Sequence, residues 1–89
     1  MARLITEEME RLNSEIARTK AQEAGITEPC MTWGDWYDHG FLVKREERAR
    51  PVFRAEVYPK YTDGRKYLMD FFSGSQVSPA RGRIQKEVL

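Results

Sequence analysis

The chain has 89 residues, of which 40% are hydrophobic and 33% are charged. A chain of this length forms one small domain, since domains typically hold about 100–150 residues, and its apolar content suffices for one shallow core. Fifteen Lys and Arg residues oppose 14 Asp and Glu residues. The resulting net charge of +1 excludes a strongly acidic nucleic-acid mimic and a strongly basic chromatin-type protein.

The apolar runs are only a few residues long, whereas a membrane-spanning helix needs about 20. Acidic residues follow too soon after the start for a signal peptide, so we expect a soluble cytoplasmic protein without membrane contact. Cys30 is the only cysteine and His39 the only histidine. This composition excludes an intrachain disulfide and a Cys/His metal centre, and we expect no metal or cofactor.

The first predicted element is a helix over residues 6–24. Thr6 is a typical N-cap and is followed by two glutamates, which favour the positive end of the helix dipole, and Gly25 ends the helix. Its narrow apolar stripe indicates docking on a small sheet, or alternatively a homodimer. The stripe residues that would form such a dimer are Met9, Leu12 and Ile16.

Residues 25–32 are interpreted as a connector, and a short helix through Asp38 follows. Thr32 and Asp35 form a variant of the capping box at its start, and Gly40 closes it. The spacing of its aromatic residues places all three on one face, which indicates an aromatic plug of the core or, alternatively, a ring exposed for stacking. These residues are Trp33, Trp36 and Tyr37.

Beyond Gly40 the hydrophobic period changes from helical to alternating. We expect strands at 41–43, 51–58 and 66–72, with a turn at 62–64 between the last two. These strands would form a three-stranded antiparallel sheet, covered by the helices on one face. The predicted fold class is therefore α+β, in one domain over residues 1–89.

The C-terminal part begins with a Ser-Gly-Ser turn, after which Gln76 and Val77 start a turn of helix or an edge contact. Residues 80–89 form a basic tail that we expect to fray unless a partner covers its weak apolar face. That face consists of Ile84, Val88 and Leu89.

The sequence contains no recognisable set of catalytic residues. A nucleophilic triad needs a base beside a serine or cysteine, and the chain has one histidine and scattered serines. No spacing pairs two carboxylates as acid and base. We therefore expect a protein that is not an enzyme, with no catalytic residues.

The most informative polar cluster is basic. Five cationic groups occur between residues 44 and 54, close in sequence to aromatic rings. Guanidinium groups hold phosphates while rings stack bases, so this pattern favours a partner or nucleic-acid surface; the alternative is a solvated loop whose cations pair with Glu46 and Glu47. The candidate binding residues are Trp33, Tyr37, Lys44, Arg45, Arg48, Arg50 and Arg54.

Several of these positions lie in segments that resemble a known protein family. The segments Thr32–Trp36, Val43–Arg48 with Pro51 and Val52, and Phe71–Val77 resemble the N-terminal domain of ArdC-type antirestriction proteins and small phage proteins that share its core. The resemblance covers residues 32–77, about half of the chain, and Glu46 stands where the family turn has glycine. It implies an α+β module of mobile elements, with single-stranded DNA binding in the antirestriction proteins and no catalysis.

We therefore expect a phage or mobile-element anti-defence protein, of the anti-CRISPR or antirestriction type, that binds a host nucleic-acid-handling complex. One alternative is a module that binds single-stranded DNA or RNA directly. Another is an oligomerising regulatory accessory protein that uses the N-terminal helix.

Overall fold

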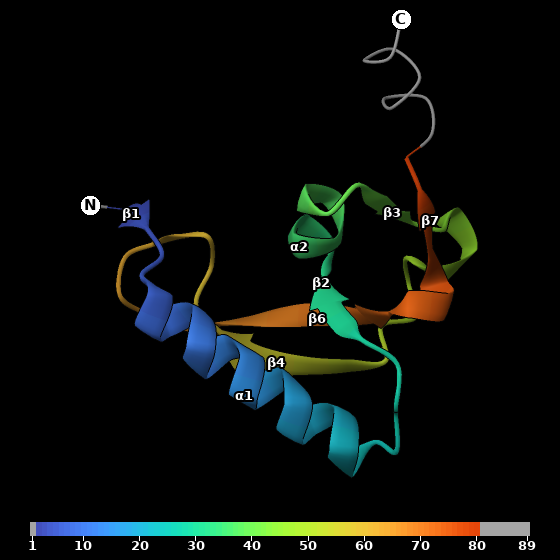
Figure 1. Ribbon diagram of the computed structural model, residues 1–89, viewed down its shortest axis with the longest axis horizontal. Helices are drawn as coiled ribbons and strands as arrows, with labels where there is room; N and C mark the ends of the chain where they lie inside the picture. Colours follow the sequence, from blue (N-terminus) through green and yellow to red (C-terminus); the bar gives the residue numbers. More distant parts are fainter. Residues whose placement is uncertain (1, 81–89) are drawn as a thin grey trace, which may run out of the picture.

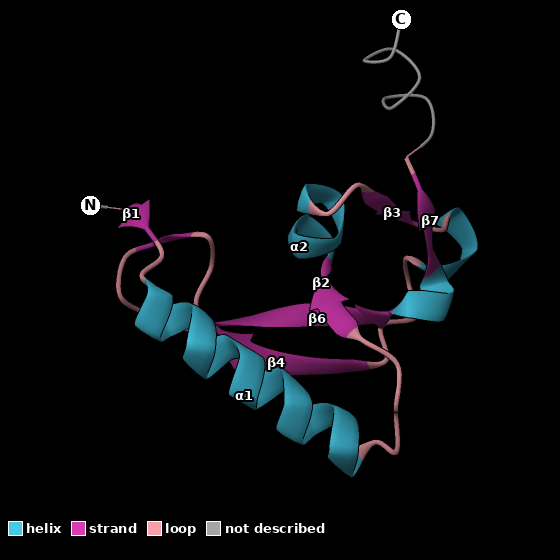
Figure 2. Ribbon diagram, in the orientation of Figure 1, coloured by secondary structure: helices cyan, strands magenta, loops and turns pink. Residues whose placement is uncertain are grey.

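The computed structural model describes residues 2–80 and confirms the α+β class, with one long helix, one short helix and antiparallel strands (Figures 1 and 2). Its main sheet has the strand order β2-β6-β4, and two further two-stranded pairs join β1 to β5 and β3 to β7. The helices are α1 (Glu7–Glu23) and α2 (Trp33–Asp38), with short 3-10 turns at Arg45–Glu47 and Gly74–Gln76. The strands are β1 (Arg3–Leu4), β2 (Cys30–Thr32), β3 (Phe41–Val43), β4 (Phe53–Val57), β5 (Tyr61–Thr62), β6 (Tyr67–Ser73) and β7 (Val77–Pro79).

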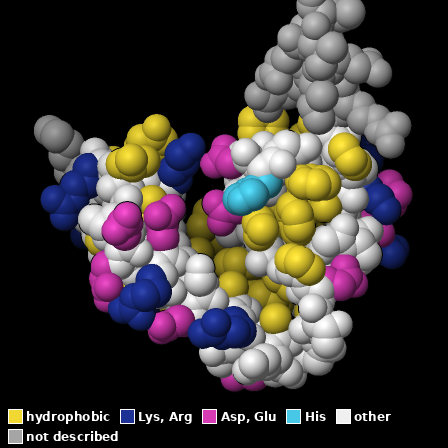
Figure 3. Space-filling view, viewed as in Figure 1, with side chains coloured by type: hydrophobic (Ala, Val, Ile, Leu, Met, Phe, Trp, Pro, Cys, Tyr) yellow, Lys and Arg dark blue, Asp and Glu magenta, His cyan; other side chains and the backbone are white. Residues whose placement is uncertain are grey.

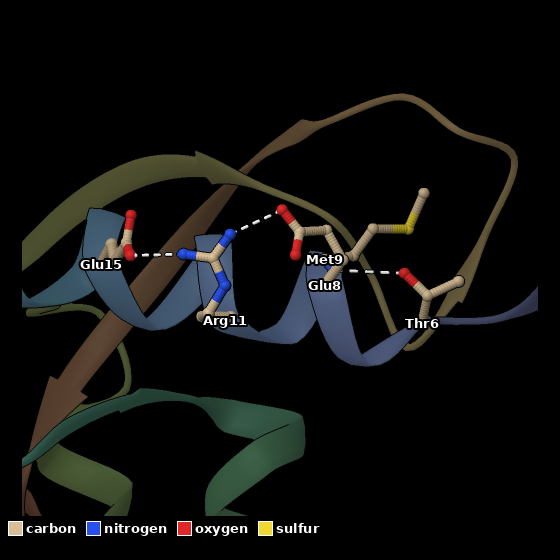
Figure 4. Close-up of polar contacts among 5 residues, drawn as sticks. All are labelled: Thr6, Glu8, Met9, Arg11 and Glu15. Carbon is tan, nitrogen blue, oxygen red and sulfur yellow. Dashed lines mark hydrogen bonds and ion pairs between the residues drawn. The ribbon is translucent and has the colours of Figure 1, made fainter.

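Helix α1 begins and ends at the residues that the sequence predicts. Thr6 Oγ1 accepts a hydrogen bond from the Met9 backbone N–H at 3.1 Å (Figure 4). At the other end Gly25 has a φ of 71°, and the N–H of Ile26 donates to the Ala21 carbonyl at 2.8 Å. This is the Schellman arrangement, which favours glycine because the left-handed backbone conformation is strained for other residues.

The outer face of α1 carries a small charge network. The Arg11 guanidinium donates to Glu8 at 2.6 Å and to Glu15 at 2.7 Å, one turn before and one turn after it (Figure 4). These carboxylates, first of all the Glu8 hydrogen bond, raise the pKa of Arg11. Because the side chains are exposed, the pairs add little to stability and mainly keep this face solvated.

The inner face of α1 packs on the sheet. Ile16 and Ala17 are half-buried against a cluster of three fully buried residues, although no residue of α1 is itself fully buried. The Asn13 amide pairs with the Tyr58 backbone, donating to its carbonyl at 2.8 Å and accepting from its N–H at 2.9 Å. The buried cluster consists of Ala55, Val57 and Phe71.

A second buried cluster lies around Phe72, the neighbour of Phe71 in β6. Successive residues of a strand point to opposite faces, so the two phenylalanines belong to different clusters. The Trp36 indole N–H donates to the Phe72 carbonyl at 2.8 Å, and its ring meets Phe41 edge-on at 5.5 Å between centroids. The buried residues of this second cluster are Trp36, Val43, Phe72 and Val77.

The strand pair over 51–58 and 66–72 is confirmed, as Phe53–Val57 paired with Tyr67–Ser73. The strand at residues 41–43 is confirmed, but its expected place is wrong, because it pairs with Val77–Pro79 outside the main sheet. The third strand is Cys30–Thr32, from the segment interpreted as a connector. Three-residue strands carry too little alternation to reveal their partners, so pairing across some 40 residues decided both cases.

The expectation that both helices cover one face of the sheet is also wrong. Helix α1 crosses β4 and β2 on the Phe71 side, whereas α2 follows directly from β2 and packs chiefly against β3 (Figure 1). Because β2 ends at Thr32, whose hydroxyl accepts from the Asp35 N–H at 3.3 Å, the chain turns into α2 at the end of the sheet. The two helices are therefore separated.

The ends of the described chain are both tied to loops. β1 pairs with β5, which the sequence does not predict, and the Ala80 N–H donates to the Gly40 carbonyl at 2.9 Å. Ala80, expected to belong to a fraying tail, is only 7% exposed. The rest of that predicted tail, residues 81–89, lies outside the described residues. Within residues 2–80, no helix has both the length and the apolar character to cross a membrane.

Candidate functional site

The face of the sheet opposite α1 carries exposed apolar and charged side chains side by side. In β6, Leu68 and Asp70 alternate with the residues that face α1, and Arg54 of β4 lies directly opposite Asp70. Trp33 of α2 and Arg48 extend this surface beyond the end of the sheet, around a shallow cavity of about 560 Å³. We call Trp33, Arg48, Arg54, Leu68 and Asp70 the open face, because neither helix covers it within residues 2–80.

Trp33 and Arg48 form the centre of the open face. The Arg48 Cζ lies 5.0 Å from the Trp33 ring centroid, which is the geometry of a cation–π contact. The Arg48 Nε also donates to the Val43 carbonyl at 3.4 Å, and the Trp33 ring meets buried Phe72 edge-on at 6.3 Å. These contacts hold the indole in place while leaving it 39% exposed.

The strand residues of the open face combine an ion pair with an apolar side chain. The Arg54 Nε donates to the Asp70 carboxylate at 2.7 Å, and both groups remain exposed. Leu68 is 61% exposed and faces Glu56 across the strand pair. A single exposed leucine is common on protein surfaces, so Leu68 matters here only together with the exposed Trp33 ring that lines the same cavity.

The basic loop, residues 44–50, is folded against Gln76. The Gln76 amide donates to the Arg50 carbonyl at 2.7 Å and to Glu47 at 3.1 Å, and its own carbonyl oxygen accepts from the Ser73 N–H at 2.8 Å. Gln76 is buried, so these bonds satisfy its polar atoms. Glu47 therefore supports the loop by accepting from Gln76, which is not the ion pair with a loop cation that the alternative expects.

Of the predicted binding residues, the structure brings together Trp33, Arg48 and Arg54 only. The Lys44 ammonium donates instead to the Ser75 carbonyl at 3.1 Å, and Arg45 and Arg50 are exposed outside the cavity of the open face. Tyr37 lines a different groove, between α1 and α2. Of the five cations, Arg48 and Arg54 line the cavity of the open face.

The sequence predicts one shared face of α2 for Trp33, Trp36 and Tyr37. In the structure the three rings have different surroundings. Trp36 is buried at 6% exposure, Trp33 turns toward the open face, and Tyr37 turns toward the groove. Helical spacing places them within about 100° of one another, and a six-residue helix at the end of a sheet has neighbours on three sides. The aromatic plug is confirmed for Trp36, and an exposed ring for Trp33 and Tyr37; a role in stacking stays a prediction.

The described residues offer little for catalysis or metal binding. Among residues 2–80, no three His, Cys, Asp or Glu side chains gather as a metal site. Burial, and secondarily the nearby Glu28 carboxylate, raise the pKa of Cys30, which disfavours the reactive thiolate at neutral pH. Asp63 has a lowered pKa because it accepts a hydrogen bond from the Tyr67 hydroxyl at 2.6 Å, and the same bond raises the pKa of Tyr67.

Two residues of the open face were missed by sequence reasoning. Leu68 and Asp70 were placed on a strand, but their face was not recognised as a surface. Alternation of Tyr67, Met69 and Phe71 with Leu68 and Phe72 was the available signal. It identifies two faces without showing which one a helix covers, since that depends on how α1 docks.

Comparison with protein-family models, curated proteins and solved structures finds no match to this chain. The resemblance of residues 32–77 to ArdC-type proteins therefore stays a prediction. The functional conclusion has to be drawn from the geometry of the open face.

Proposed function

We propose that the protein is a non-enzymatic anti-defence protein of phages or mobile elements, and that it binds a host nucleic-acid-handling complex through the open face. The small size of the chain and the resemblance of residues 32–77 support the class. The open face supports the mode of action, because it offers a binding surface and no catalytic constellation.

The observation that carries the proposal is the exposed indole of Trp33 beneath the Arg48 guanidinium, with Leu68 on the same face. Tryptophan and arginine are the side chains most enriched among the residues that dominate protein–protein binding energy. Trp33 is also held by Phe72, so little conformational entropy is lost when a partner covers it.

The charges on this face favour a protein partner over a bare phosphate backbone. Arg54 is already neutralised by Asp70 at 2.7 Å, and Glu56 lies on the same side of β4 by strand alternation. Affinity for nucleic acid grows with the number of phosphates neutralised, and this surface presents nearly balanced charge. We expect single-stranded oligonucleotides to bind only in the micromolar range or more weakly.

Direct binding of single-stranded nucleic acid is the second candidate, and one observation favours it. A ring beside a guanidinium is the arrangement on which bases stack while phosphates are held. The two candidates differ in how binding responds to salt and to nuclease.

The test compares tagged wild-type protein with Trp33→Ala and Arg48→Glu in quantitative co-purification from host cells, with and without nuclease. Arg65→Glu is the matched control: it makes the same charge change at an exposed arginine outside the open face. We expect one partner complex, resistant to nuclease, that wild type and Arg65→Glu retain and the two open-face variants lose.

A parallel titration of a fluorescent single-stranded oligonucleotide at several salt concentrations separates the candidates. Nanomolar binding that falls steeply with salt, and that Arg48→Glu abolishes, would make the nucleic-acid binder the correct reading. A partner retained equally by all four proteins would contradict the open face as the binding surface.

A further inference from the structure

The main sheet has one long edge that the described part of the chain leaves unpaired. In the strand order β2-β6-β4, β4 is hydrogen-bonded on one side only, to β6 (Figure 1). β4 has five residues, whereas β2, at the other edge, has three. An unpaired edge presents a row of backbone N–H and C=O groups to which a further strand can bind. The edge of β4 is therefore a candidate surface for strand addition.

Hydrogen bonds of the central strand β6 show which of its backbone groups face β4. The Gly74 N–H donates to the Pro29 carbonyl at 3.0 Å, so the backbone groups of Gly74 face β2. Backbone groups of successive strand residues alternate between the two neighbouring strands, which turns those of Ser73 and Phe71 toward β4. The Val52 N–H agrees with this, because it donates to the Phe71 carbonyl at 2.9 Å.

The same alternation identifies the free groups of β4. Phe53 lies opposite Phe71, so the backbone groups of Phe53 and, two residues later, of Ala55 face β6. The N–H and C=O groups of Arg54 and Glu56 point the other way, to the unpaired edge. Within residues 2–80 these groups have no hydrogen-bond partner.

Helix α1 closes only the end of this edge. The Asn13 amide binds both backbone groups of Tyr58, which comes next in the same alternation. From there the helix crosses the Phe71 face of the sheet to β2, and hydrophobic side chains line the hollow between α1 and α2 (Figure 3). Arg54 and Glu56, by contrast, are exposed.

The charged side chains of this edge are arranged in a self-complementary order. Arg54 and Glu56 lie on one face of β4, and Ala55 between them points to the other face. If two copies of β4 pair antiparallel about Ala55, Arg54 of each copy lies opposite Glu56 of the other, and every free N–H and C=O of both residues finds a partner. Centring the pair on Arg54 or on Glu56 instead would place like charges opposite each other, which is destabilising. The charges therefore select a single register.

The residues at the centre of such a pair also fit it sterically. Ala55 would lie opposite its own copy in a non-hydrogen-bonded pair, where Cα atoms are about 4.5 Å apart and side chains are closest, so a small residue is suited to this place. On the other face, Arg54 binds Asp70 through Nε at 2.7 Å. Its terminal NH₂ groups remain for Glu56 of the second copy.

We propose that two copies of this chain form a symmetric dimer through β4, with Ala55 at the two-fold axis and with one continuous antiparallel sheet across both copies. Arg54 of each copy then pairs with Glu56 of the other. The dimer is independent of the proposed function, because it joins the sheets at their edges and does not use Trp33 or Arg48 of the open face.

Charge exchange between two variants tests this interface on the purified protein. Sedimentation analysis should show wild type approaching twice the mass of one chain as its concentration rises. Glu56→Arg and Arg54→Glu should each weaken the self-association about tenfold, because two attractive cross-strand pairs become repulsive. An equimolar mixture of the two variants should restore it, since all cross-strand pairs are again of opposite charge. Glu46→Arg, at an exposed glutamate outside β4, is the matched control and should associate like wild type.

Three results of this experiment would overturn the proposal. The first is a monomeric wild type at every concentration. The second is a dimer that neither charge reversal weakens, which would place the interface elsewhere. The third is a mixture that associates no better than the two variants do separately.

Hydrogen exchange examines the edge directly in wild type, without a substitution. The amides of Arg54 and Glu56 should exchange slowly in concentrated protein and several-fold faster after dilution, because only the dimer protects them. The Ala55 amide faces β6 and serves as the internal control, which should stay slow at both concentrations. Rapid exchange of the Arg54 and Glu56 amides in concentrated protein would contradict the pairing.

Discussion

Two adjacent residues of β6 have very different surroundings. Phe72 packs among residues that are themselves fully buried and that come from α2, β3 and β7. Phe71 is equally buried, but its helical neighbours, Ile16 and Ala17, are only half-buried, and a groove remains beside it. Helix α1 therefore adds no fully buried residue to the cover of Phe71, whereas α2, β3 and β7 each add one to the cover of Phe72.

The physical cause is side-chain size and hydrogen bonding. On the Phe72 side the Trp36 indole fills the space and donates to the Phe72 carbonyl at 2.8 Å. On the Phe71 side α1 presents small residues such as Ala17 and Ala21, and its firmest polar anchor is Asn13 on the Tyr58 backbone. Small side chains bring the helix close to the sheet yet leave volume beside it.

The largest effect is expected on the Phe72 side. Trp36→Ala should lower the free energy of unfolding by about 3–5 kcal/mol, because it leaves a large cavity and an unpaired carbonyl. Thermal and urea unfolding measure it. Leu68→Ala, at a side chain of the same strand as Phe72 that is 61% exposed, is the control and should cost less than about 1 kcal/mol. A loss below about 1 kcal/mol for Trp36→Ala would show that the two sides do not differ as described.

The equivalent change on the Phe71 side should be smaller. Ile16 is half-buried, so Ile16→Ala should cost about 1–2 kcal/mol in the same unfolding experiments. Glu15→Ala, on the solvated face of α1, serves as the control and should leave stability nearly unchanged. A cost as large as that of Trp36→Ala would mean that α1 closes its core as tightly as α2 does.

The homodimer through α1 stays a prediction. The molecular mass of wild type and of Leu12→Asp, measured by light scattering, tests it. Met9 and Leu12 are half-buried, like Ile16. If they form a dimer seam, Leu12→Asp should convert a dimer into a folded monomer; if α1 only docks on its own sheet, Leu12→Asp has the mass of wild type and is destabilised. An unchanged mass together with an unchanged melting temperature would contradict both.

Asn13→Ala tests whether the Asn13 side chain anchors α1 to the Tyr58 backbone. It removes both hydrogen bonds to the Tyr58 backbone, and we expect a loss of about 1 kcal/mol because water reaches this half-buried site. Hydrogen exchange should show faster exchange of the Tyr58 amide as well. Ser14→Ala, at the next and exposed position, should change neither quantity; an unaffected Tyr58 amide in Asn13→Ala would refute the anchor.

The smallest effect concerns the turn before β6. The pKa of Asp63 is lowered by the Tyr67 hydroxyl, so the ionised carboxylate stabilises the fold above its unfolded-state pKa of about 3.9, and this contribution is lost as the pH falls through the lower folded value. Tyr67→Phe should therefore raise the Asp63 pKa, as measured by carboxyl-carbon NMR titration. Tyr61→Phe is the control. A pKa that stays low in Tyr67→Phe would assign the shift to the Arg65 backbone bond instead.

The sequence by itself determined the elements whose signals are local. The Thr6 cap, the Gly25 end of α1, the alternation in β4 and β6 and the cap of α2 at Thr32 all act within a few residues, so each could be predicted correctly. For the candidate site, local composition identified Trp33, Arg48 and Arg54, because aromatic and arginine residues are recognisable wherever they fold.

Tertiary structure alone decided which segments meet. β2 pairs with β6, and β3 pairs with β7, across some 40 residues. A strand of three residues is too short for its hydrophobic pattern to indicate which strand it pairs with. The same holds for Gln76 beneath the basic loop, for Asn13 on Tyr58, and for the separation of Trp33 from Tyr37. Each depends on contacts that form only when distant segments pack, and those contacts decide which face of the sheet stays open.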